Sequence, residues 1–134
     1  MWRHEASIEI AAAPARIWQL FADVPGWKRW NAGIASIELH GPFAEGTSFT
    51  MQPPGMDAFT STLIEVQENR LFTDQTMLDE VTVVVSHRIE PLDAARSRVS
   101  YVSVVTGPEA AEIGAAVTAD FGDVLAALKQ LAEA

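Results

Sequence analysis

One histidine of the chain stands on the apolar side of a predicted strand. In the stretch EVTVVVSHRIE, the odd positions from 81 to 89 carry three valines, a histidine and an isoleucine, while the even positions are mainly polar. Because side chains alternate between the two faces of a strand, this pattern directs His87 toward the core. An imidazole there could serve as an acid, a base or a hydrogen-bond partner. The alternative is a neutral core histidine bonded to one neighbour.

The only tyrosine of the chain has the same kind of position. In RVSYVSVV, Tyr101 shares its side with Val99 and Ser103, whereas Arg98 and Ser100 mark the other side as solvent-facing. A buried tyrosine usually finds a partner for its hydroxyl group. That partner could be a protein group or a ligand carbonyl, and the pattern leaves both open. This tyrosine and the histidine above are the two candidates for proton transfer.

No other catalytic or metal-binding motif is recognisable. The three histidines, His4, His40 and His87, are far apart in the sequence and lack metal-ligand spacing, and the chain has no cysteine. It also lacks a nucleophile turn, a phosphate-binding glycine-rich loop and a dinucleotide fingerprint. We therefore expect no metal and no organic cofactor. We expect a structural role for His4 and an exposed position for His40.

Two tryptophans lie beside a Pro-Gly pair in the stretch DVPGWKRWN. Trp27 and Trp30 would point to nearly the same side of a short helical turn, because residues three apart are neighbours on a helix. They could close the core or line a binding site; we favour the first role for Trp27 and the second for Trp30 with Asn31. Further along, Met51 and Phe59 flank a Pro-Pro-Gly break and could form a mobile rim, although loop packing would explain them equally well.

The composition indicates one globular domain, residues 1–134, with 49% hydrophobic and 20% charged residues. A net charge of −9, with scattered lysines and arginines, argues against nucleic acid and anionic membrane surfaces as partners. No apolar run approaches the roughly 18 residues of a membrane span, and the first residues lack the pattern of a signal peptide. The absence of cysteine is compatible with the reducing cytoplasm, where we expect the protein.

Hydrophobic periodicity and turn residues predict one helical region and seven strands before the C-terminal segment. The helical region starts at Pro14 and is interrupted by Pro25 and Gly26, which leaves a short helix pair. The predicted strands cover residues 2–10, 34–40, 47–52, 59–67, 71–78, 81–90 and 98–106. Because most of these strands turn directly into the next, they predict an antiparallel sheet.

The last predicted element is a long helix from about Glu109 to about Ala132. Its apolar residues recur at spacings of three and four: Ile113, Val117, Phe121, Val124, Leu128 and Leu131. They form one apolar stripe, which we expect to pack on one face of the sheet in an α+β domain. Asp120 lies beside the stripe and is expected in solvent.

Three segments in this order, IEIAAAPARIWQLFADVPGWKRWN, IASIELHGPFAEGTSFTM and RVSYVSVVTGP, precede the final helix. With them the whole chain resembles the polyketide cyclase/dehydrase-like branch of the START and birch-pollen-allergen (SRPBCC) superfamily. The resemblance implies a helix-grip fold, in which a curved antiparallel seven-stranded sheet wraps around the C-terminal helix and leaves a cavity. The small residues Gly114, Ala115, Ala116, Thr118 and Ala119 favour a pocket under the first half of that helix.

The resemblance further implies a small hydrophobic ligand, apolar or aromatic and polyketide- or lipid-like, held in this cavity. The expected ligand-binding residues are Trp27, Trp30, Asn31, Phe49, Met51, Phe59, His87 and Tyr101. If the protein is an enzyme, the resemblance implies cyclase or dehydrase activity with His87 and Tyr101 as the proton-transfer candidates. The competing hypothesis is a protein-interaction or regulatory module with an incidental cavity, which an exposed apolar patch would favour. The sequence leaves the oligomeric state open, a homodimer included.

Overall fold

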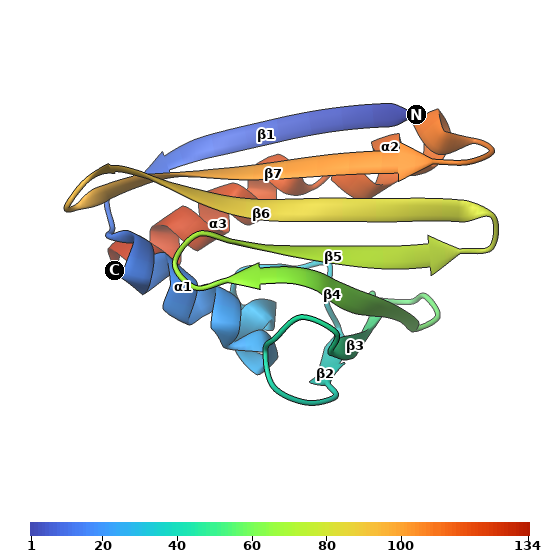
Figure 1. Ribbon diagram of the computed structural model, residues 1–134, viewed down its shortest axis with the longest axis horizontal. Helices are drawn as coiled ribbons and strands as arrows, with labels where there is room; N and C mark the ends of the chain where they lie inside the picture. The colour runs from blue at the N-terminus through green and yellow to red at the C-terminus, as the bar shows by residue number, and fades with distance from the viewer.

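An antiparallel sheet carries all the helices on one of its faces in the computed structural model, which describes residues 1–134 (Figure 1). The strands are β1 (Trp2–Ile10), β2 (Ser36–Leu39), β3 (Ser48–Gln52), β4 (Phe59–Gln67), β5 (Leu71–Leu78), β6 (Val81–Asp93) and β7 (Arg96–Thr106). Their order across the sheet is β1-β7-β6-β5-β4-β3-β2. The seven predicted strands are all confirmed, with ends that differ by at most three residues.

The predicted helix pair after the first strand is also present. The α-helix α1 (Pro14–Ala22) has Pro14 in its first turn, where the missing N–H is not needed. The 3-10 helix η1 (Val24–Arg29) follows and runs through the Pro-Gly pair. The residues of α1 that are buried lie on one side of the helix: Ile17, Trp18, Leu20 and Phe21. No helix of the chain combines the length and the apolar character needed to cross a membrane.

The C-terminal helix is bent, and the expectation of one continuous helix was wrong. It consists of α2 (Ala110–Thr118) and α3 (Phe121–Glu133). The Thr118 hydroxyl donates a hydrogen bond to the Gly114 carbonyl oxygen at 2.9 Å, a local bond that bends helices. Asp120 follows with φ −102° and ψ 4°, outside the helical region. The bend brings α2 and α3 separately onto the curved sheet, and the helix-grip arrangement is retained.

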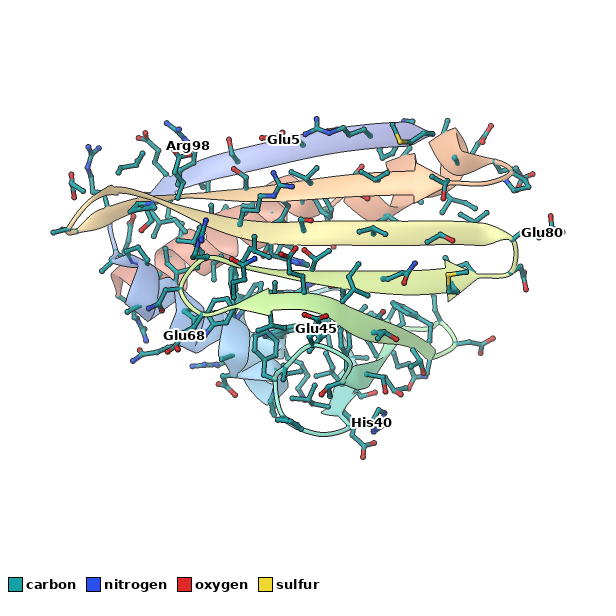
Figure 2. All side chains as sticks on the ribbon, in the orientation of Figure 1. Glu5, His40, Glu45, Glu68, Glu80 and Arg98 are labelled. Carbon is teal, nitrogen blue, oxygen red and sulfur yellow. The ribbon has the colours of Figure 1, made fainter.

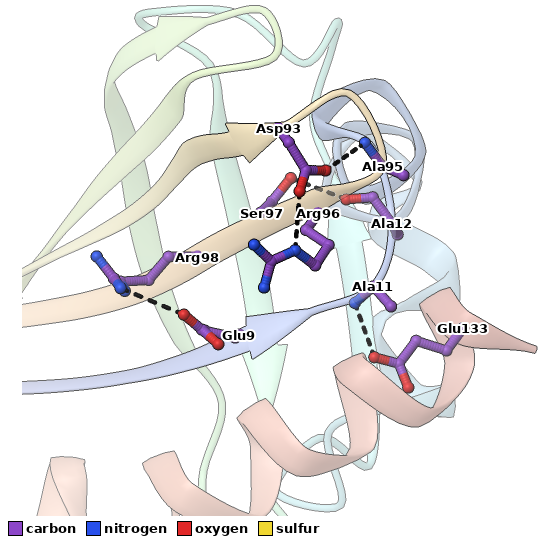
Figure 3. A network of polar contacts seen from close by, with 9 residues as sticks. All are labelled: Glu9, Ala11, Ala12, Asp93, Ala95, Arg96, Ser97, Arg98 and Glu133. Atoms are coloured by element: carbon purple, nitrogen blue, oxygen red, sulfur yellow. Dashed lines mark hydrogen bonds and ion pairs between the residues drawn. The ribbon is translucent and has the colours of Figure 1, made fainter.

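The far end of α3 is fixed to the end of β1, as Figure 3 shows. The Ala11 N–H donates a hydrogen bond to Glu133 Oε2 at 2.8 Å, and this bond helps to lower the pKa of the Glu133 carboxyl group. Nearby, the buried Ser97 hydroxyl donates to the Ala12 carbonyl oxygen at 2.9 Å. The first bond joins the end of β1 to the last helix, and the second joins the segment after β1 to β7.

The small residues of α2 accommodate a side chain of the sheet. A Cβ atom added to Gly114 would overlap the six-membered ring of Trp2. The space that the sequence predicted beneath this part of the helix is therefore taken up at Gly114 by an indole. Glycine here allows α2 to approach β1 closely.

Candidate functional site

Three polar side chains enter the core from adjacent strands in the middle of the sheet. They are Asp74 on β5, His87 on β6 and Tyr101 on β7. His87 lies directly opposite Tyr101, and both face the helices as the alternation of apolar residues predicted. Asp74 lies two residues along β5 from Phe72, the residue opposite His87, so its side chain enters the same face. The centre of the inner face is thus polar although its surroundings are apolar.

Aromatic rings fix the position of the histidine. The His87 ring stacks on Phe72 with centroids 4.0 Å apart and an interplanar angle of 8°, and Trp27 also stacks on Phe72, at 5.4 Å. The edge of Tyr101 meets His87 at 4.6 Å. Phe21 packs against this series from α1, at 5.0 Å from Phe72. The imidazole is therefore held between two rings and cannot turn freely.

The hydrogen bond of His87 determines its tautomer. Its Nδ1 atom lies 3.2 Å from the Phe72 carbonyl oxygen. A carbonyl oxygen can only accept, so Nδ1 carries the hydrogen and Nε2 keeps its free electron pair. Burial lowers the pKa of His87 to about 3, and the bond to Phe72 opposes this shift. At neutral pH the ring is uncharged, and its Nε2 atom is available as an acceptor or a base.

Asp74 is the functional candidate that the sequence analysis missed. Burial raises the pKa of its carboxyl group to about 7, and its Oδ2 atom lies 3.9 Å from His87 Nδ1. A carboxyl group with a pKa near 7 can both donate and accept a proton at neutral pH. In LFTDQTML the residue alternates with Phe72 and Thr76. The other side of this strand, with Leu71 and Met77, is equally apolar, so the sequence of β5 alone gave no signal that Asp74 faces the core.

Three buried polar atoms near these rings have no hydrogen-bond partner: Trp30 Nε1, the Tyr101 hydroxyl oxygen and Ser103 Oγ. Trp27 differs, because its Nε1 donates to the Phe21 carbonyl oxygen at 2.9 Å. Burial raises the pKa of Tyr101, and the nearby Asp74 charge adds to the effect, so the phenol stays protonated. The two tryptophans therefore have different environments: the Trp27 N–H is hydrogen-bonded within the core, and the Trp30 N–H is not.

The remaining predicted ligand-binding residues lie toward the β2–β3 side of the sheet. Phe49 is buried and meets the edge of Trp27 at 5.5 Å. Met51 and Phe59 are partly buried neighbours across the β3–β4 pair. Asn31 uses its Oδ1 atom to accept the N–H of the residue two positions later at 2.9 Å, which shapes the loop before β2. Five of the eight predicted residues are linked by ring contacts around Phe72: Trp27, Trp30, Phe49, His87 and Tyr101.

The other singled-out side chains lie outside this cluster. His4 stacks on Trp2 at 5.9 Å, and the exposed His40 bonds to Thr50 Oγ1 through Nε2 at 2.8 Å. Asp120 is exposed, as expected. Its carboxyl group is nevertheless partly shielded from water, which raises the pKa of that group.

The bend between α2 and α3 meets the loop that precedes β2. A Cβ atom added to Gly33 would lie 3.1 Å from Asn31 Oδ1 and 3.2 Å from Asp120 Oδ2, so both oxygens border the same small space. Phe121, directly after the bend, meets Tyr101 edge-on at 5.5 Å, and the charge of Asp120 helps to raise the pKa of that hydroxyl group. Two connecting segments thus adjoin above the polar centre of the sheet.

Two surface hollows lie away from these residues. One, of about 530 Å³, is lined by α3 residues Asp123, Ala126, Ala127, Lys129, Gln130 and Glu133. The other, of about 300 Å³, is lined by Glu5, Arg70, Leu71, Arg88, Ile89, Glu90, Arg98 and Ser100. Neither contains a predicted ligand-binding residue, and the cavity between helix and sheet stays a prediction.

The family model described as polyketide cyclase / dehydrase and lipid transport matches residues 1–133. The chain belongs to this family. No curated protein sequence matches it. This membership agrees with the resemblance of the three sequence segments and with the helix-grip arrangement of the sheet and helices.

Several solved structures have the same fold. The protein XoxI from Bacillus cereus superposes with a TM-score of 0.81 at 22% identity, covering 98% of this chain and 95% of its own. The di-domain aromatase/cyclase BexL gives 0.79 at 20% identity over 97% of this chain, which spans 46% of that protein. Norcoclaurine synthase from Thalictrum flavum, in complex with dopamine and hydroxybenzaldehyde, gives 0.74 at 17% identity, covering 97% of this chain and 85% of its own. At these identities the likeness establishes the fold.

Proposed function

We propose that this protein binds a small aromatic or apolar molecule on the inner face of the sheet, beneath the bend between α2 and α3. The observation that carries the proposal is the group of buried polar atoms without partners on Trp30, Tyr101 and Ser103. Buried polar atoms in native proteins are almost always bonded, to the protein or to a bound molecule. A ligand with matching oxygen atoms would satisfy them.

The chemistry of these atoms limits the ligand. An indole N–H only donates, so Trp30 requires an acceptor such as a carbonyl oxygen, while the hydroxyls of Tyr101 and Ser103 can donate or accept. The surrounding rings of Phe21, Phe72 and other aromatic residues favour a flat apolar body. A fused-ring or polyketide-like molecule bearing carbonyl or phenol groups fits this combination. The aromatic molecules bound in the norcoclaurine synthase structure support an aromatic ligand by analogy.

Binding requires a passage into the core, and the meeting of the α2–α3 bend with the loop at residues 31–33 is the place we propose. Neither segment belongs to the hydrogen-bonded sheet. Asp120 and Asn31 face the same small space there. Connecting segments of this kind move more readily than the strands they cover.

The binding proposal is tested with 1,8-dihydroxyanthraquinone as the probe, followed by quenching of tryptophan emission and by the rise in thermal midpoint. We expect saturable binding that Trp30→Phe weakens and that Ser103→Ala weakens. Native mass spectrometry of freshly purified protein provides a second readout through any co-purified small molecule. A folded protein that binds neither this probe nor lipid-like analogues would instead favour the interaction-module hypothesis.

Proton transfer is a second candidate function, which the pairing of Asp74 with His87 favours. The two groups offer a carboxyl with a pKa of about 7 and a neutral imidazole 3.9 Å away. In an aldol cyclisation, a base takes the proton from the carbon beside one carbonyl, that carbon bonds to a second carbonyl carbon, and the resulting alkoxide takes up a proton. We assign proton abstraction to Asp74, whose pKa of about 7 makes it the stronger base, while His87 Nε2, with a pKa of about 3, would accept a hydrogen bond from the substrate. The protonated Tyr101 hydroxyl would then hydrogen-bond to the carbonyl oxygen where negative charge develops.

The test of catalysis compares affinity with turnover on any ligand that is found. For an enzyme, His87→Gln, Asp74→Asn and Tyr101→Phe each lower turnover by about 10²–10⁴-fold, whereas affinity falls by no more than about 10-fold. If only affinity changes, the groups orient the ligand and the protein is a carrier or sensor.

A further inference from the structure

β1 lies at one margin of the sheet and pairs along its whole length of nine residues with β7. No strand or helix lies beyond it at the upper margin in Figure 1. The opposite margin is formed by β2, which has four residues. A long strand edge presents unpaired backbone groups that can pair with another chain.

The hydrogen-bond pattern of the sheet fixes which backbone groups of β1 face outward. The Ile89 N–H donates to the Arg70 carbonyl oxygen at 2.7 Å, so odd residues of β6 bond to β5 and even residues bond to β7. Even residues of β6 lie opposite even residues of β7, so these bond to each other and the odd residues of β7 bond to β1. The odd residues of β7 lie opposite the even residues of β1, which are therefore the ones that bond within the sheet. Consistent with this, the Glu9 carbonyl oxygen points away from β7 and accepts a hydrogen bond from Lys129 Nζ at 3.1 Å. The groups on the free edge belong to Arg3, Glu5, Ser7 and Glu9.

We propose that two copies of this chain associate by antiparallel pairing of their β1 strands, with Arg3 of each copy opposite the partner's Glu9. The two-fold axis then passes beside Ala6. In this register Glu5 lies opposite the partner's Ser7. Every outward-facing residue of one strand meets an outward-facing residue of the other, and each such pair exchanges backbone hydrogen bonds. The backbone N–H of the partner's Arg3 takes the place of Lys129 Nζ as the donor to the Glu9 carbonyl oxygen.

Charge selects this register over its neighbours. A shift by two residues in one direction sets Glu5 opposite the partner's Glu5, and a shift in the other direction sets Glu5 opposite the partner's Glu9. Opposite charges directly across a strand pair stabilise it, and like charges destabilise it. Among the registers that pair three or more of the outward-facing residues, only the proposed one sets a positive charge against a negative one.

The charged side chains are already arranged for such a contact. Arg3 Nη2 lies 3.0 Å from Glu5 Oε1, and Glu9 Oε1 lies 3.4 Å from Arg98 Nη2 (Figure 3). These side chains lie along the β1 margin of the sheet, where Figure 2 labels Glu5 and Arg98. Association extends them into a row of alternating charge that runs from Arg98 through Glu9 to the partner's Arg3 and the partner's Glu5.

The same register covers apolar surface on the inner face. Trp2 lies opposite the partner's Ile10, and His4 lies opposite the partner's Ile8. Trp2 and Ile8 are only half-buried in the single chain, so pairing removes more of their surface from water.

The helix beside this edge leaves room for the partner. The hollow of about 530 Å³ on α3 contains Lys129 and Glu133, whose side chains reach the end of β1. Its other residues include Ala126 and Ala127, which are small. This hollow adjoins the edge at which the second copy would pair, and the small side chains of Ala126 and Ala127 help to keep it open.

The test is sedimentation equilibrium of the full chain over a wide concentration range. We expect a mass of twice 14.5 kDa at high concentration. Arg3→Glu and Glu9→Arg each set like charges opposite one another at two symmetric positions, and each should raise the dissociation constant about tenfold or more. Combining the two substitutions restores the pairing of opposite charges and the dimer. A monomer at every concentration, or a double variant as weak as the single ones, overturns the proposal.

Two further variants separate edge pairing from a general effect of charge. Glu38→Arg makes the same change as Glu9→Arg but on β2, and it should leave the dimer unchanged. Ser7→Pro removes an N–H that faces the free edge and is not used within the chain, so the fold should persist while the dimer is lost. A dimer that survives Ser7→Pro, or one that Glu38→Arg dissociates, contradicts the proposal. None of these positions belongs to the interior site, so ligand binding is an independent readout.

Discussion

Within the core, Asp74 Oδ2 lies 3.9 Å from His87 Nδ1, and burial shifts the pKa of the two groups in opposite directions. The pKa of Asp74 rises from 3.8 to about 7, and the pKa of His87 falls from 6.5 to about 3. Both groups are therefore uncharged in the folded protein between about pH 3 and pH 7, where their unfolded counterparts would be charged over most of the range. The fold accommodates two ionisable groups in an apolar centre by keeping them neutral.

The two shifts make opposite contributions to the pH dependence of the free energy of unfolding. The folded protein keeps the Asp74 proton that the unfolded chain releases above pH 3.8, so this contribution to stability falls as pH rises to about 7. The unfolded chain binds a proton at His87 below pH 6.5 that the folded protein takes up only near pH 3, so this contribution rises with pH between those values. In the shared window between about pH 4 and pH 6.5, the contributions of Asp74 and His87 to the free energy of unfolding change in opposite directions and largely cancel.

Asp74→Asn removes the contribution that falls with pH. Relative to the parent protein, the free energy of unfolding of this variant should therefore rise by about 1.4 kcal/mol per pH unit between about pH 4 and pH 7. Urea unfolding at a series of pH values measures the difference. A difference that is independent of pH would show that the carboxyl group ionises normally in the folded protein.

His87→Gln removes the contribution that rises with pH and should have the reverse effect. Its free energy of unfolding relative to the parent should fall by about 1.4 kcal/mol per pH unit between about pH 3 and pH 6.5. The double variant with Asp74→Asn is the control, since its difference from the parent should be nearly flat in the shared window. The same slope sign for both single variants would contradict the assignment.

Gly114→Ala should destabilise the protein although alanine favours helices. Overpacking costs about 1–3 kcal/mol, and an added Cβ that overlaps atoms of the Trp2 ring places this site toward the upper end of that range, above the gain of about 1 kcal/mol in helix propensity. Gly122→Ala in α3 is the matched control, because nothing lies within 4 Å of the added atom. We expect that variant to be more stable than the parent in urea unfolding. Combining Gly114→Ala with Trp2→Ala should remove most of the penalty, and failure to do so would locate the strain elsewhere.

The sequence predicted most of the fold because its signals are local. Alternation and turn residues located the strands, and β1, β4 and β5 begin and end at the predicted residues. The bend in the C-terminal helix could not be predicted from the apolar stripe, because the stripe continues through it. At the bend the Thr118 hydroxyl bonds to Gly114 and Asp120 lies near the distant Gly33, and neither feature can be read from the apolar stripe.

The candidate site was predicted in part for the same reason. Strand parity correctly directed His87 and Tyr101 inward, since parity is a property of each strand alone. The difference between Trp27 and Trp30 depends on a carbonyl oxygen of α1 that happens to be in reach of one indole. Asp74 was overlooked because charged residues are usually exposed, and only the neighbouring strands reveal how deeply it is buried.

The two tryptophans should respond differently to replacement by phenylalanine. Trp27→Phe removes the donor to the Phe21 carbonyl oxygen and should lower the free energy of unfolding by about 0.5–1.5 kcal/mol more than Trp30→Phe does. Trp30→Phe removes an N–H that has no partner, so its loss is limited to packing. Parallel urea titrations measure the difference. Equal losses would show that the Trp27 bond contributes nothing to stability.

Ser103→Ala and Ser97→Ala form a matched pair on the inner face of β7. Both serines are fully buried, but Ser97 donates to the Ala12 carbonyl oxygen at 2.9 Å whereas Ser103 Oγ has no partner. Ser97→Ala leaves a carbonyl oxygen unpaired and should destabilise the protein by about 1–3 kcal/mol. Ser103→Ala removes an unpaired hydroxyl, as Tyr101→Phe does, and both should leave the free protein as stable as the parent or more stable.

If the hydroxyls serve a ligand, the same two variants bind 1,8-dihydroxyanthraquinone about 2- to 10-fold more weakly, because each loses one hydrogen bond. Calorimetric titration and thermal unfolding of the same samples give both quantities. Loss of stability without loss of affinity would show that Ser103 and Tyr101 belong to the core alone.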